Sequence, residues 1–383
     1  MGLPEIISLS HEYGSDAQYL IAGGGNTSYK DEKYLHIKAS GFALSTIDAE
    51  GFVTMERVKL ASIWKKDYPS DPTAREARAL ADLMAAKAPG QEGKRPSVET
   101  LLHETIPDRY IVHTHPALIN GLTCGKEGLT AAVGMFGETI VWVPTVNPGY
   151  ILAATVKQEL EDFARTSEVA PDYIFLQNHG VFVSGATPEE IREKYKNLFK
   201  TVKKSVLRIP DRSKVSEHDD ASAEWSRILK HAYAAASGGR FAIRHHSDRE
   251  TSLVLKDRDS FAPVSSAFTP DHIVYCGHAP LYLESLPADM DATVEMLRRF
   301  ELEHGVLPKL IAVKDMGVYG CGPNQMAADN AVAMFGDAVN IAVYAGSFGG
   351  SSPMPPAQID FIRGWEVEHY RTKVSLDDGG GSS

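Results

Sequence analysis

Cysteine is scarce in this chain: only Cys124, Cys276 and Cys321 occur among 383 residues, and no CxxC pair is present. Structural zinc sites built on thiolates use closely paired cysteines, and small secreted domains carry dense disulfides, so the sequence disfavours both. Scarce, unpaired cysteines are typical of a reducing compartment. We therefore expect a cytoplasmic protein without a disulfide framework.

Long apolar runs and excess positive charge are also missing. No window reaches the roughly 18 to 20 uninterrupted apolar residues that a membrane-spanning helix needs, and the opening MGLPEIISLSHEYGSD has no basic segment followed by an apolar one. Lys and Arg total 39 against 50 Asp and Glu, a net charge of −11. A field of that sign opposes unspecific binding to nucleic acid or anionic membranes. We expect neither as a partner.

What is present is an α/β pattern with a boundary in its second half. Residues 1–60 are predicted as strands and turns, and alternating helices and strands follow up to residue 206. Helices over a sheet are the expected result. The polar segment 209–222 lacks periodicity and predicts a domain boundary. The expected division is a first domain over 1–208, a second over 223–370, and a flexible tail over 371–383.

The predicted elements around the candidate site are short. One helix is expected to start at Ser97 with this residue as its N-cap. Strands are expected over 109–117 and, as one continuous strand, over 173–185. A helix over 151–165 lies between these two strands in the sequence. The candidate chemistry is found at the ends of these elements.

Two stretches of the first half recur, in the same order, in the second half. PDRYIVHTHPAL (107–118) aligns with PDHIVYCGHAPL (270–281), and IFLQNHGVFVSG (174–185) aligns with IAVKDMGVYGCG (311–322). These matches predict a duplicated domain whose second copy is shorter between the two stretches. The alternative is that strand-and-glycine patterns recur by chance in α/β proteins.

Histidine offers the metal ligands that cysteine does not. His113 and His115 stand two residues apart in a predicted strand, so both side chains point to one face and can reach the same ion. His179 comes directly before Gly180, where a glycine permits close approach. Three neutral imidazoles suit Zn²⁺, or Mn²⁺, Co²⁺ or Fe²⁺, with one position left open. Any one of these histidines, taken alone, is more typical of a hydrogen-bonded residue in the core; the three together favour a metal site.

Several residues are candidates for acid/base chemistry or anion binding. Glu99 lies in the first turn of its predicted helix, as a general base beside the metal or simply as a helix-start charge. The turn GGGNTS (23–28), the pair Ser40–Gly41 and the helix start at Ser97 offer amides and hydroxyls that suit an anion, and Lys38 is a nearby cation. These turns match neither a Walker loop nor a dinucleotide fingerprint.

Together these motifs resemble the class II aldolase and adducin family, whose members carry five such motifs in this order. The five are Gly25-Asn26-Thr27-Ser28, Ser40-Gly41, Pro96-Ser97-Val98-Glu99, His113-Thr114-His115 and His179-Gly180. Within the family, the phrases PSVETLLH, HTHP and TPDH are most similar to the aldolase part of bifunctional rhamnulose-1-phosphate aldolase/alcohol dehydrogenases. No GxGxxG-containing dehydrogenase domain follows in this sequence.

The resemblance implies a fold and a set of site residues. The fold is a class II aldolase-like α/β/α domain with a central, mainly antiparallel sheet, followed here by a degenerate second copy. The implied zinc ligands are His113, His115 and His179, with Glu99 as a further ligand or as the acid/base. The residues expected near the substrate phosphate are Asn26, Thr27, Lys38, Ser40, Gly41 and Ser97. Tyr150 is a candidate for a second proton relay, or else a packed aromatic at a helix start.

The implied activity is metal-dependent cleavage of a deoxyketose 1-phosphate. The expected substrate is L-rhamnulose 1-phosphate, cleaved to dihydroxyacetone phosphate and L-lactaldehyde without a Schiff-base lysine. Three alternatives stay open: a pentulose-phosphate 4-epimerase, a sugar-acid phosphate decarboxylase, and a non-enzymatic adducin-like interaction domain. The turn Lys38-Ala39-Ser40-Gly41 departs from the family's Thr-Pro-Ser/Thr-Gly, so an unphosphorylated or differently acidic sugar also stays open.

The second half has lost the metal-binding set in this alignment. The aligned residues are Cys276 for His113, His278 for His115 and Met316 for His179. Since one histidine does not hold a catalytic ion, we expect residues 223–370 to serve packing. The resemblance also implies fourfold rings with sites between subunits. We therefore expect a homo-oligomer, either a dimer or a tetramer.

Overall fold

The computed structural model describes residues 2–215 and 219–365 of the chain. The chain divides into two compact units, Met1–Val206 and Leu207–Ser383. The predicted flexible tail, residues 371–383, lies outside the described residues.

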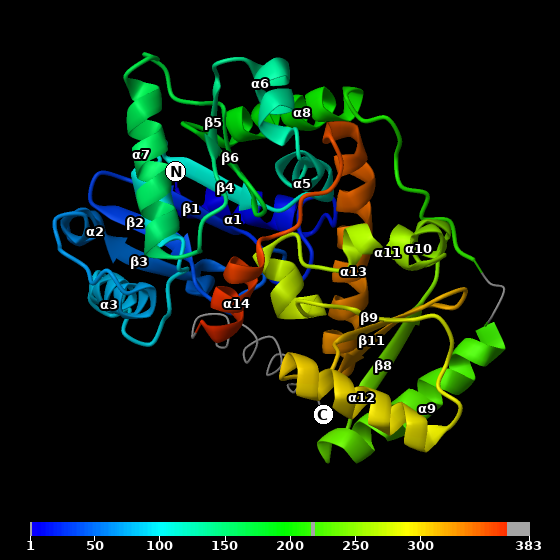
Figure 1. The fold of residues 1–383 in the computed structure, drawn as a ribbon. Helices are drawn as coiled ribbons and strands as arrows, with labels where there is room; N and C mark the ends of the chain where they lie inside the picture. The colour runs from blue at the N-terminus through cyan, green and yellow to red at the C-terminus, as the bar shows by residue number, and fades with distance from the viewer. Residues whose placement is uncertain (1, 216–218, 366–383) are drawn as a thin grey trace. The chain divides into compact units, whose positions relative to one another are not determined.

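A seven-stranded sheet forms the centre of the first unit, with the strand order β3-β2-β1-β4-β7-β6-β5 (Figure 1). All neighbouring strands in it are antiparallel except β5 and β6, which are parallel. The predicted mainly antiparallel sheet is therefore confirmed. The strands are β1 (Asn26–Lys30), β2 (Tyr34–Lys38), β3 (Phe52–Glu56), β4 (Tyr110–Thr114), β5 (Ile140–Val143), β6 (Tyr173–Leu176) and β7 (Gly180–Gly185).

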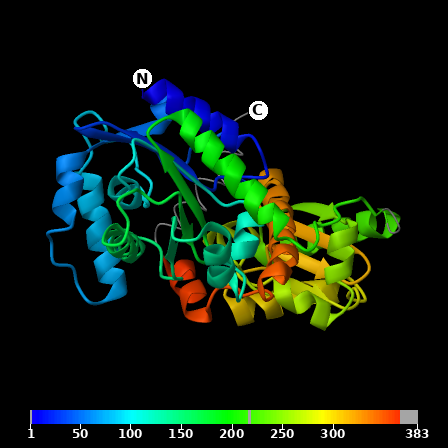
Figure 2. The same ribbon diagram turned by 90° about the horizontal axis from the view of Figure 1, so that it is seen from above.

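Helices cover both faces of this sheet (Figure 2). On one face α1 and α8 contact each other and strands β1, β4 and β7, and α5 contacts α8. On the other face α2, α3, α4 and α7 contact one another. The helices are α1 (Leu3–Gly14), α2 (Arg57–Ile63), α3 (Pro72–Ala85), α4 (Thr100–Thr105), α5 (Ala117–Thr123), α6 (Gly128–Phe136), α7 (Tyr150–Ala164) and α8 (Pro188–Lys204), with a 3-10 turn η1 (Ala49–Gly51).

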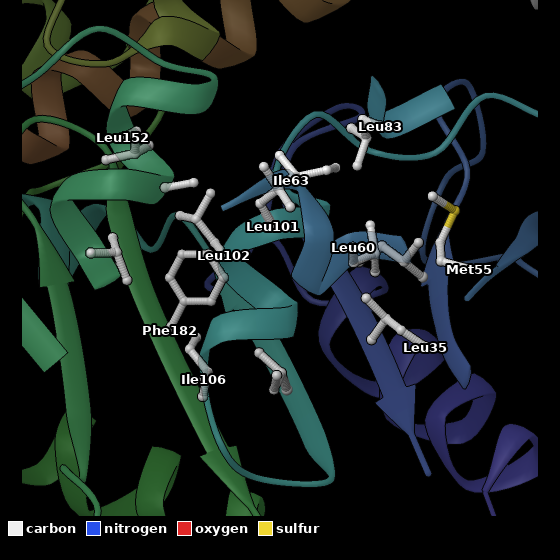
Figure 3. Close-up of a cluster of buried hydrophobic side chains, with 14 of the residues drawn as sticks. Leu35, Met55, Leu60, Ile63, Leu83, Leu101, Leu102, Ile106, Leu152 and Phe182 are labelled. Atoms are coloured by element: carbon white, nitrogen blue, oxygen red, sulfur yellow. The ribbon is translucent and has the colours of Figure 1, made fainter. Parts of the chain in front are cut away.

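The core under α2, α4 and α7 holds the short helix α4 in place. Leu101 and Leu102 of α4 lie in a cluster of buried side chains with Leu60 of α2 and Phe182 of β7 (Figure 3). Leu102 is fully buried, and burying a leucine contributes about 1.5 to 3 kcal/mol relative to an exposed one. A helix of six residues has little stability of its own, so this anchoring decides where its N-terminal residues lie.

Three details of the predicted elements were wrong. Helices α1 and α2 occupy part of the region expected to hold only strands and turns. Helix α4 begins at Thr100 with Glu99 as its N-cap, although the Ser97 hydroxyl accepts a hydrogen bond from the Glu99 amide, the bond that an N-cap serine makes. The expected single strand over 173–185 is the hairpin β6–β7, since Asn178 turns the chain in the left-handed region at a φ of 58°.

The second unit contains a four-stranded sheet with the order β8-β11-β10-β9. Its only parallel pair is β9 with β10; the other pairs are antiparallel. The strands are β8 (Ala242–His246), β9 (Leu281–Leu283), β10 (Leu310–Val313) and β11 (Gly317–Gly322). The helices are α9 (Asp219–Ser237), α10 (Arg249–Val254), α11 (Arg258–Phe261), α12 (Met290–His304), α13 (Gln325–Ala345) and α14 (Pro356–Gly364), with short turns η2 (Ala262–Val264), η4 (Gly346–Phe348) and the π-helical η3 (His272–Cys276).

This sheet reproduces the β4-β7-β6-β5 half of the first sheet. Strand directions agree pair by pair, and α12 and α13 occupy the chain positions of α7 and α8. Registers agree too: Ile311 faces Tyr319 as Ile174 faces Phe182. The predicted degenerate second copy is therefore a partial one, which in the described residues has no strands corresponding to β1, β2 and β3.

The sequence alignment of the copies was half right. The stretch 311–322 does form the counterpart of β6–β7, but the counterpart of β4 is β8, not 270–281. That stretch contains the π-helix η3 and the start of β9. Two short apolar segments with two histidines each look alike in sequence, whatever structure they form. In the sheet register, Tyr319 faces His245 as Phe182 faces His113.

Helix α13 is the one described helix long and apolar enough to cross a membrane; with η4 it spans Gln325–Phe348. Over its most apolar window 56% is buried, and the helix contacts β8, β10 and β11. It is the core helix of the second unit, which explains its apolar composition.

Candidate metal centre

The end of β4 and the start of β7 bring three imidazoles together. The ligand atoms of His113, His115 and His179 all lie within 4.8 Å of one another, and we call these three residues the histidine cluster. The Nε2 atoms of His113 and His115 are 2.9 Å apart. The alternating geometry of a strand accounts for the first two, and the β6–β7 turn supplies the third.

His113 is oriented by its surroundings. Its Nδ1 lies 3.0 Å from the carbonyl oxygen of Val181, and its ring stacks on Phe182. A carbonyl only accepts, so Nδ1 carries the proton and Nε2 keeps its lone pair. Burial lowers the pKa of this fully buried imidazole well below its ordinary value, so the ring is neutral. A neutral imidazole with a fixed tautomer is the form that ligates metals.

Glu99 faces the histidine cluster from the start of α4. Its Oε1 lies 3.5 Å from Nε2 of His113 and 3.4 Å from Nε2 of His179. Burial raises the pKa of Glu99, while the charge that the imidazoles carry when protonated and a hydrogen bond from Asn26 lower it, to about 2. The carboxylate is therefore ionised. Oε1 is buried and accepts no hydrogen bond from any described residue.

The donor set fits a divalent ion. A buried carboxylate oxygen without a hydrogen-bond donor is costly unless a cation satisfies it. Here that oxygen points at three convergent imidazoles, a set that suits Zn²⁺ and other divalent ions of the first transition row. His113, His115 and His179 would hold the ion, with Glu99 beside it.

Gly180 permits the close contact between the two strand ends. A Cβ at this position would lie 2.5 Å from the carbonyl oxygen of Thr114 and 2.6 Å from the His115 ring. Both distances are too short for any side chain. The glycine thus allows β7 to start directly beside the His-x-His strand.

The turn after β2 lies beside the segment that leads into α4. The carbonyl of Lys38 accepts a hydrogen bond from the amide of Ser97 at 3.3 Å, and the Ser40 amide donates to the carbonyl of Arg95 at 2.8 Å. Gly41 follows with a φ of 95°, which favours glycine. The structure therefore brings Lys38, Ser40, Gly41 and Ser97 close to one another.

Asn26 and Thr27 are separated by the alternation of β1. Asn26 faces α4, where its Nδ2 donates to Glu99 Oε2 and its Oδ1 contacts Nε2 of His103. Thr27 points to the opposite face, with its hydroxyl 2.7 Å from that of Ser10 in α1. The structure places Asn26 in the site, while the Thr27 side chain is turned away from it.

Tyr150 lies at the first residue of α7. Its ring packs against Trp64 and Tyr68, and its amide donates to the buried carboxylate of Glu76 at 2.6 Å. Burial raises the pKa of its phenol. Among the described residues it forms no hydrogen bond or ring contact with the histidine cluster or Glu99. These contacts are those of the alternative role, a packed aromatic at a helix start.

Sequence reasoning missed Lys30 and His103, and it assigned Ser28 to the GGGNTS turn as an anion-binding hydroxyl and not to a polar strand face. Ser28 and Lys30 follow Asn26 on the same face of β1, and all three reach α4. Their signal was present: polar residues at every second position of a strand, in the phrase NTSYK, predict one polar face. His103 stands at the end of PSVETLLH, which was noted only as a family motif.

The fold and the site together define a class II aldolase-like domain, and the sequence comparison agrees. The model of the family "Class II Aldolase and Adducin N-terminal domain" matches residues 5–203. The chain belongs to this family.

Individual relatives are distant. The uncharacterized oxidoreductase YuxG of Bacillus subtilis is 25% identical over 314 residues, which cover 76% of this chain and 43% of that protein. The chain thus spans less than half the length of this curated relative. The N-terminal class II aldolase domain of a Thermoplasma acidophilum protein is 27% identical, with a TM-score of 0.44, over 53% of this chain and 92% of that one. L-fuculose-1-phosphate aldolase from Thermus thermophilus is 15% identical, with a TM-score of 0.32, over 52% and 92% of the two chains.

Proposed function

We propose that this protein is a metal-dependent aldolase that cleaves a deoxyketose 1-phosphate. The substrate we propose is L-rhamnulose 1-phosphate, and the products are dihydroxyacetone phosphate and L-lactaldehyde. The metal we propose is Zn²⁺. Both assignments follow from the motifs that the chain shares with the family.

One observation carries the proposal: the unsatisfied Oε1 of Glu99 points at the histidine cluster. This arrangement combines a site for a divalent cation with a carboxylate that can move a proton at the same place. When bound, the ion supplies Lewis-acid stabilisation for the negative charge that retro-aldol cleavage leaves on the oxygens of the three-carbon product.

The chain's own residues have two further roles in this proposal. Glu99 is ionised in the free protein, so it accepts the proton that leaves the substrate hydroxyl and delivers it to the carbon of the three-carbon fragment, since its Oε1 accepts no other hydrogen bond from the described residues. The amides and hydroxyls around Ser40, Gly41 and Ser97, with the cation of Lys38, bind the phosphate. Positioning by these groups keeps the reacting carbon beside Glu99.

The first experiment is a coupled assay for dihydroxyacetone phosphate. L-rhamnulose 1-phosphate and L-fuculose 1-phosphate are supplied to zinc-loaded protein, with and without a chelator. We expect release from the rhamnulose ester that the chelator abolishes and zinc restores. No release from zinc-replete protein would contradict the proposal, and assays of pentulose-phosphate epimerisation and sugar-acid decarboxylation would then test the two alternatives.

A pair of variants on one helix tests the role of the carboxylate. Glu99→Gln is expected to lower kcat by about 10²- to 10⁴-fold, the usual contribution of general acid–base catalysis. Glu104→Gln is the matched control, because Glu104 pairs with Arg57 and not with the histidine cluster. It is expected to leave kcat within about twofold of the parent enzyme, well below that range. Equal losses in the two variants would show that Glu99 acts only through the helix.

A further inference from the structure

Three polar side chains of β1 form a ladder of hydrogen bonds to α4. Asn26 bridges Glu99 and His103, and the Ser28 hydroxyl lies 2.7 Å from Nδ1 of His103. The Lys30 ammonium donates to the main-chain carbonyls at the end of α4, 2.8 Å from that of His103. His103 is fully buried between these groups. None of the roles assigned so far uses Ser28, His103 or Lys30.

The chemistry of the groups gives this ladder a direction. Asn26 donates through Nδ2 to Glu99 Oε2, so its Oδ1 is the atom that accepts from His103. His103 must then donate from Nε2 to that oxygen. Burial lowers the pKa of His103 to about 3, so the ring is neutral and Nδ1 has a lone pair. The Ser28 hydroxyl therefore donates to Nδ1.

We propose that Ser28, His103 and Asn26 form a one-way hydrogen-bond chain that positions the Glu99 carboxylate, with His103 locked as its Nε2–H tautomer. Every donor in the chain points toward Glu99. Oε2 is thereby held, and Oε1 stays turned toward the histidine cluster. His103 is a positioning residue in this scheme, because it acts through Asn26.

Lys30 fixes the far end of the same helix. Its ammonium donates to the carbonyls of His103, Glu104 and Ile106, where the helix leaves carbonyls without partners. A cation at a helix C-terminus is also favoured by the helix dipole. The short helix is thus held at both ends by one strand. Rotation of Glu99 away from the histidine cluster would break its hydrogen bond with Asn26.

The tautomer of His103 can be measured without substrate. We would label histidine with ¹⁵N and record long-range ¹H–¹⁵N spectra at pH 7, assigning His103 by the signal lost in His103→Gln. The expected pattern has a proton on Nε2 and a bare Nδ1. A proton on Nδ1 alone, or on both nitrogens, would overturn the proposed direction.

A second experiment measures zinc affinity by competition with a chromophoric chelator. Outer-shell partners of metal sites typically contribute 10- to 100-fold in affinity or activity. We expect losses of about that size in His103→Leu and about tenfold in Ser28→Ala, which removes a single atom. His103→Gln keeps a donor toward Asn26 and should recover most of the loss. Ser10→Ala is the matched control, because its buried hydroxyl bonds to Thr27 on the opposite face of β1.

Two results would overturn the positioning role. One is zinc affinity and kcat in His103→Leu equal to those of the parent protein. The other is an equal loss in Ser10→Ala and Ser28→Ala, which would indicate a general packing effect. The effect on kcat rests on the proposed aldolase function, but the tautomer and the zinc affinity do not. If no sugar phosphate is cleaved, these two measurements still test the chain.

Discussion

The two units can be compared at one place, the end of the His-x-His strand and its counterpart in the second unit. The backbone geometry is the same at both strand ends, but the side chains differ. In the first unit His113, His115 and His179 converge. The same sheet positions in the second unit hold His245, Ser247 and Met316. A glycine follows His179 and Met316 alike, at Gly180 and Gly317. In both units a side chain at this glycine would collide with the neighbouring strand end.

The turn before this glycine is also preserved. Asn178 and Asp315 occupy equivalent positions and have φ values of 58° and 61°. Non-glycine residues adopt this region rarely, and Asn and Asp do so more readily than most. The backbone conformation of the strand ends is therefore kept in the second unit, where only one of the three positions holds an imidazole, that of His245. This backbone conformation does not depend on the histidine cluster. The capacity to bind a metal lies in a few side chains at these ends.

The second unit uses its polar groups for structure instead. Asp248, the N-cap of α10, accepts from the amide of Thr251 at 2.8 Å and lies 2.7 Å from His246 Nε2 and 2.9 Å from Arg212. The equivalent N-cap in the first unit is Pro116, whose side chain makes no cap. The strand end that carries three converging imidazoles in the first unit thus carries a network of hydrogen bonds and ion pairs around Asp248 in the second.

The sharpest test of this contrast removes one histidine from each unit. His113→Ala is expected to abolish tight zinc binding and to lower kcat by more than the 10- to 100-fold typical of outer-shell changes, because a ligand itself is lost. His245→Ala, at the matching sheet position, should leave zinc content and kcat unchanged. Metal analysis after dialysis and the aldolase assay measure both. Zinc loss in His245→Ala would show that the second unit contributes to the ion.

The converse test adds the missing ligands to the second unit. Ser247→His with Met316→His, in the His113→Ala background, should restore binding of a zinc ion, since the strand ends share one backbone conformation. We expect weaker binding than in the parent, by about 10- to 100-fold, because the described part of the second unit offers no counterpart of Asn26 to orient an outer shell. His245 must also give up its hydrogen bond to the carbonyl of Met316. Zinc titration of this variant measures the binding. No binding at all would mean that the backbone geometry of the two strand ends differs more than the shared sheet register suggests.

The shared glycines predict that both units are sensitive to a side chain at this position, and the second unit more so. Gly180→Ala and Gly317→Ala each force a methyl group against a backbone carbonyl, and overpacking of this kind costs typically about 1 to 3 kcal/mol. Gly317 also has a φ of 108°, which strains alanine further. Urea unfolding measures both losses. Gly90→Ala, which meets no atom within 4 Å but has a φ of 82°, separates backbone strain from the collision.

The sequence predicted the groups whose geometry is local. The spacing of His113 and His115 predicts convergence because strand side chains alternate, and Gly180 marks the close approach of His179. The ladder from β1 to α4 was not predictable in this way. Its partners, such as Ser28 and His103, are 75 residues apart, and only the folded chain shows which of them meet.

The register of the second copy failed for a related reason. Residues 270–281 matched the stretch around β4 because both are short apolar segments with two histidines, but the sheet pairs β8 in the place of β4. Which segment corresponds to β4 follows from which strand pairs with β11, and strand pairing is a property of the sheet as a whole. The hairpin was aligned correctly because its sequence pattern is more specific. Asn178 and Asp315, which adopt the left-handed conformation, each stand two residues before a glycine, Gly180 or Gly317.

The smallest expected effect concerns the network that replaces the metal site. Burial raises the pKa of Asp248, but His246, the Thr251 amide and Arg212 outweigh it and lower the pKa. The ionised carboxylate therefore stabilises the second unit above the unfolded-state pKa of about 3.9, and this contribution is lost as the pH falls through the folded-state pKa. Asp248→Asn should cost about 1 to 2 kcal/mol at pH 7, and less as the pH falls below 4.

Urea unfolding at pH 7 and below pH 4 measures the loss in free energy of unfolding caused by Asp248→Asn. Asp257→Asn is the matched control, because Asp257 also caps a helix through its side chain but is exposed, and asparagine caps equally well. We expect a change there below about 0.5 kcal/mol. Equal losses in the two variants, or a loss in Asp248→Asn that persists at low pH, would show that the helix cap matters and the charge does not. The two strand ends would then differ only in whether they bind a metal.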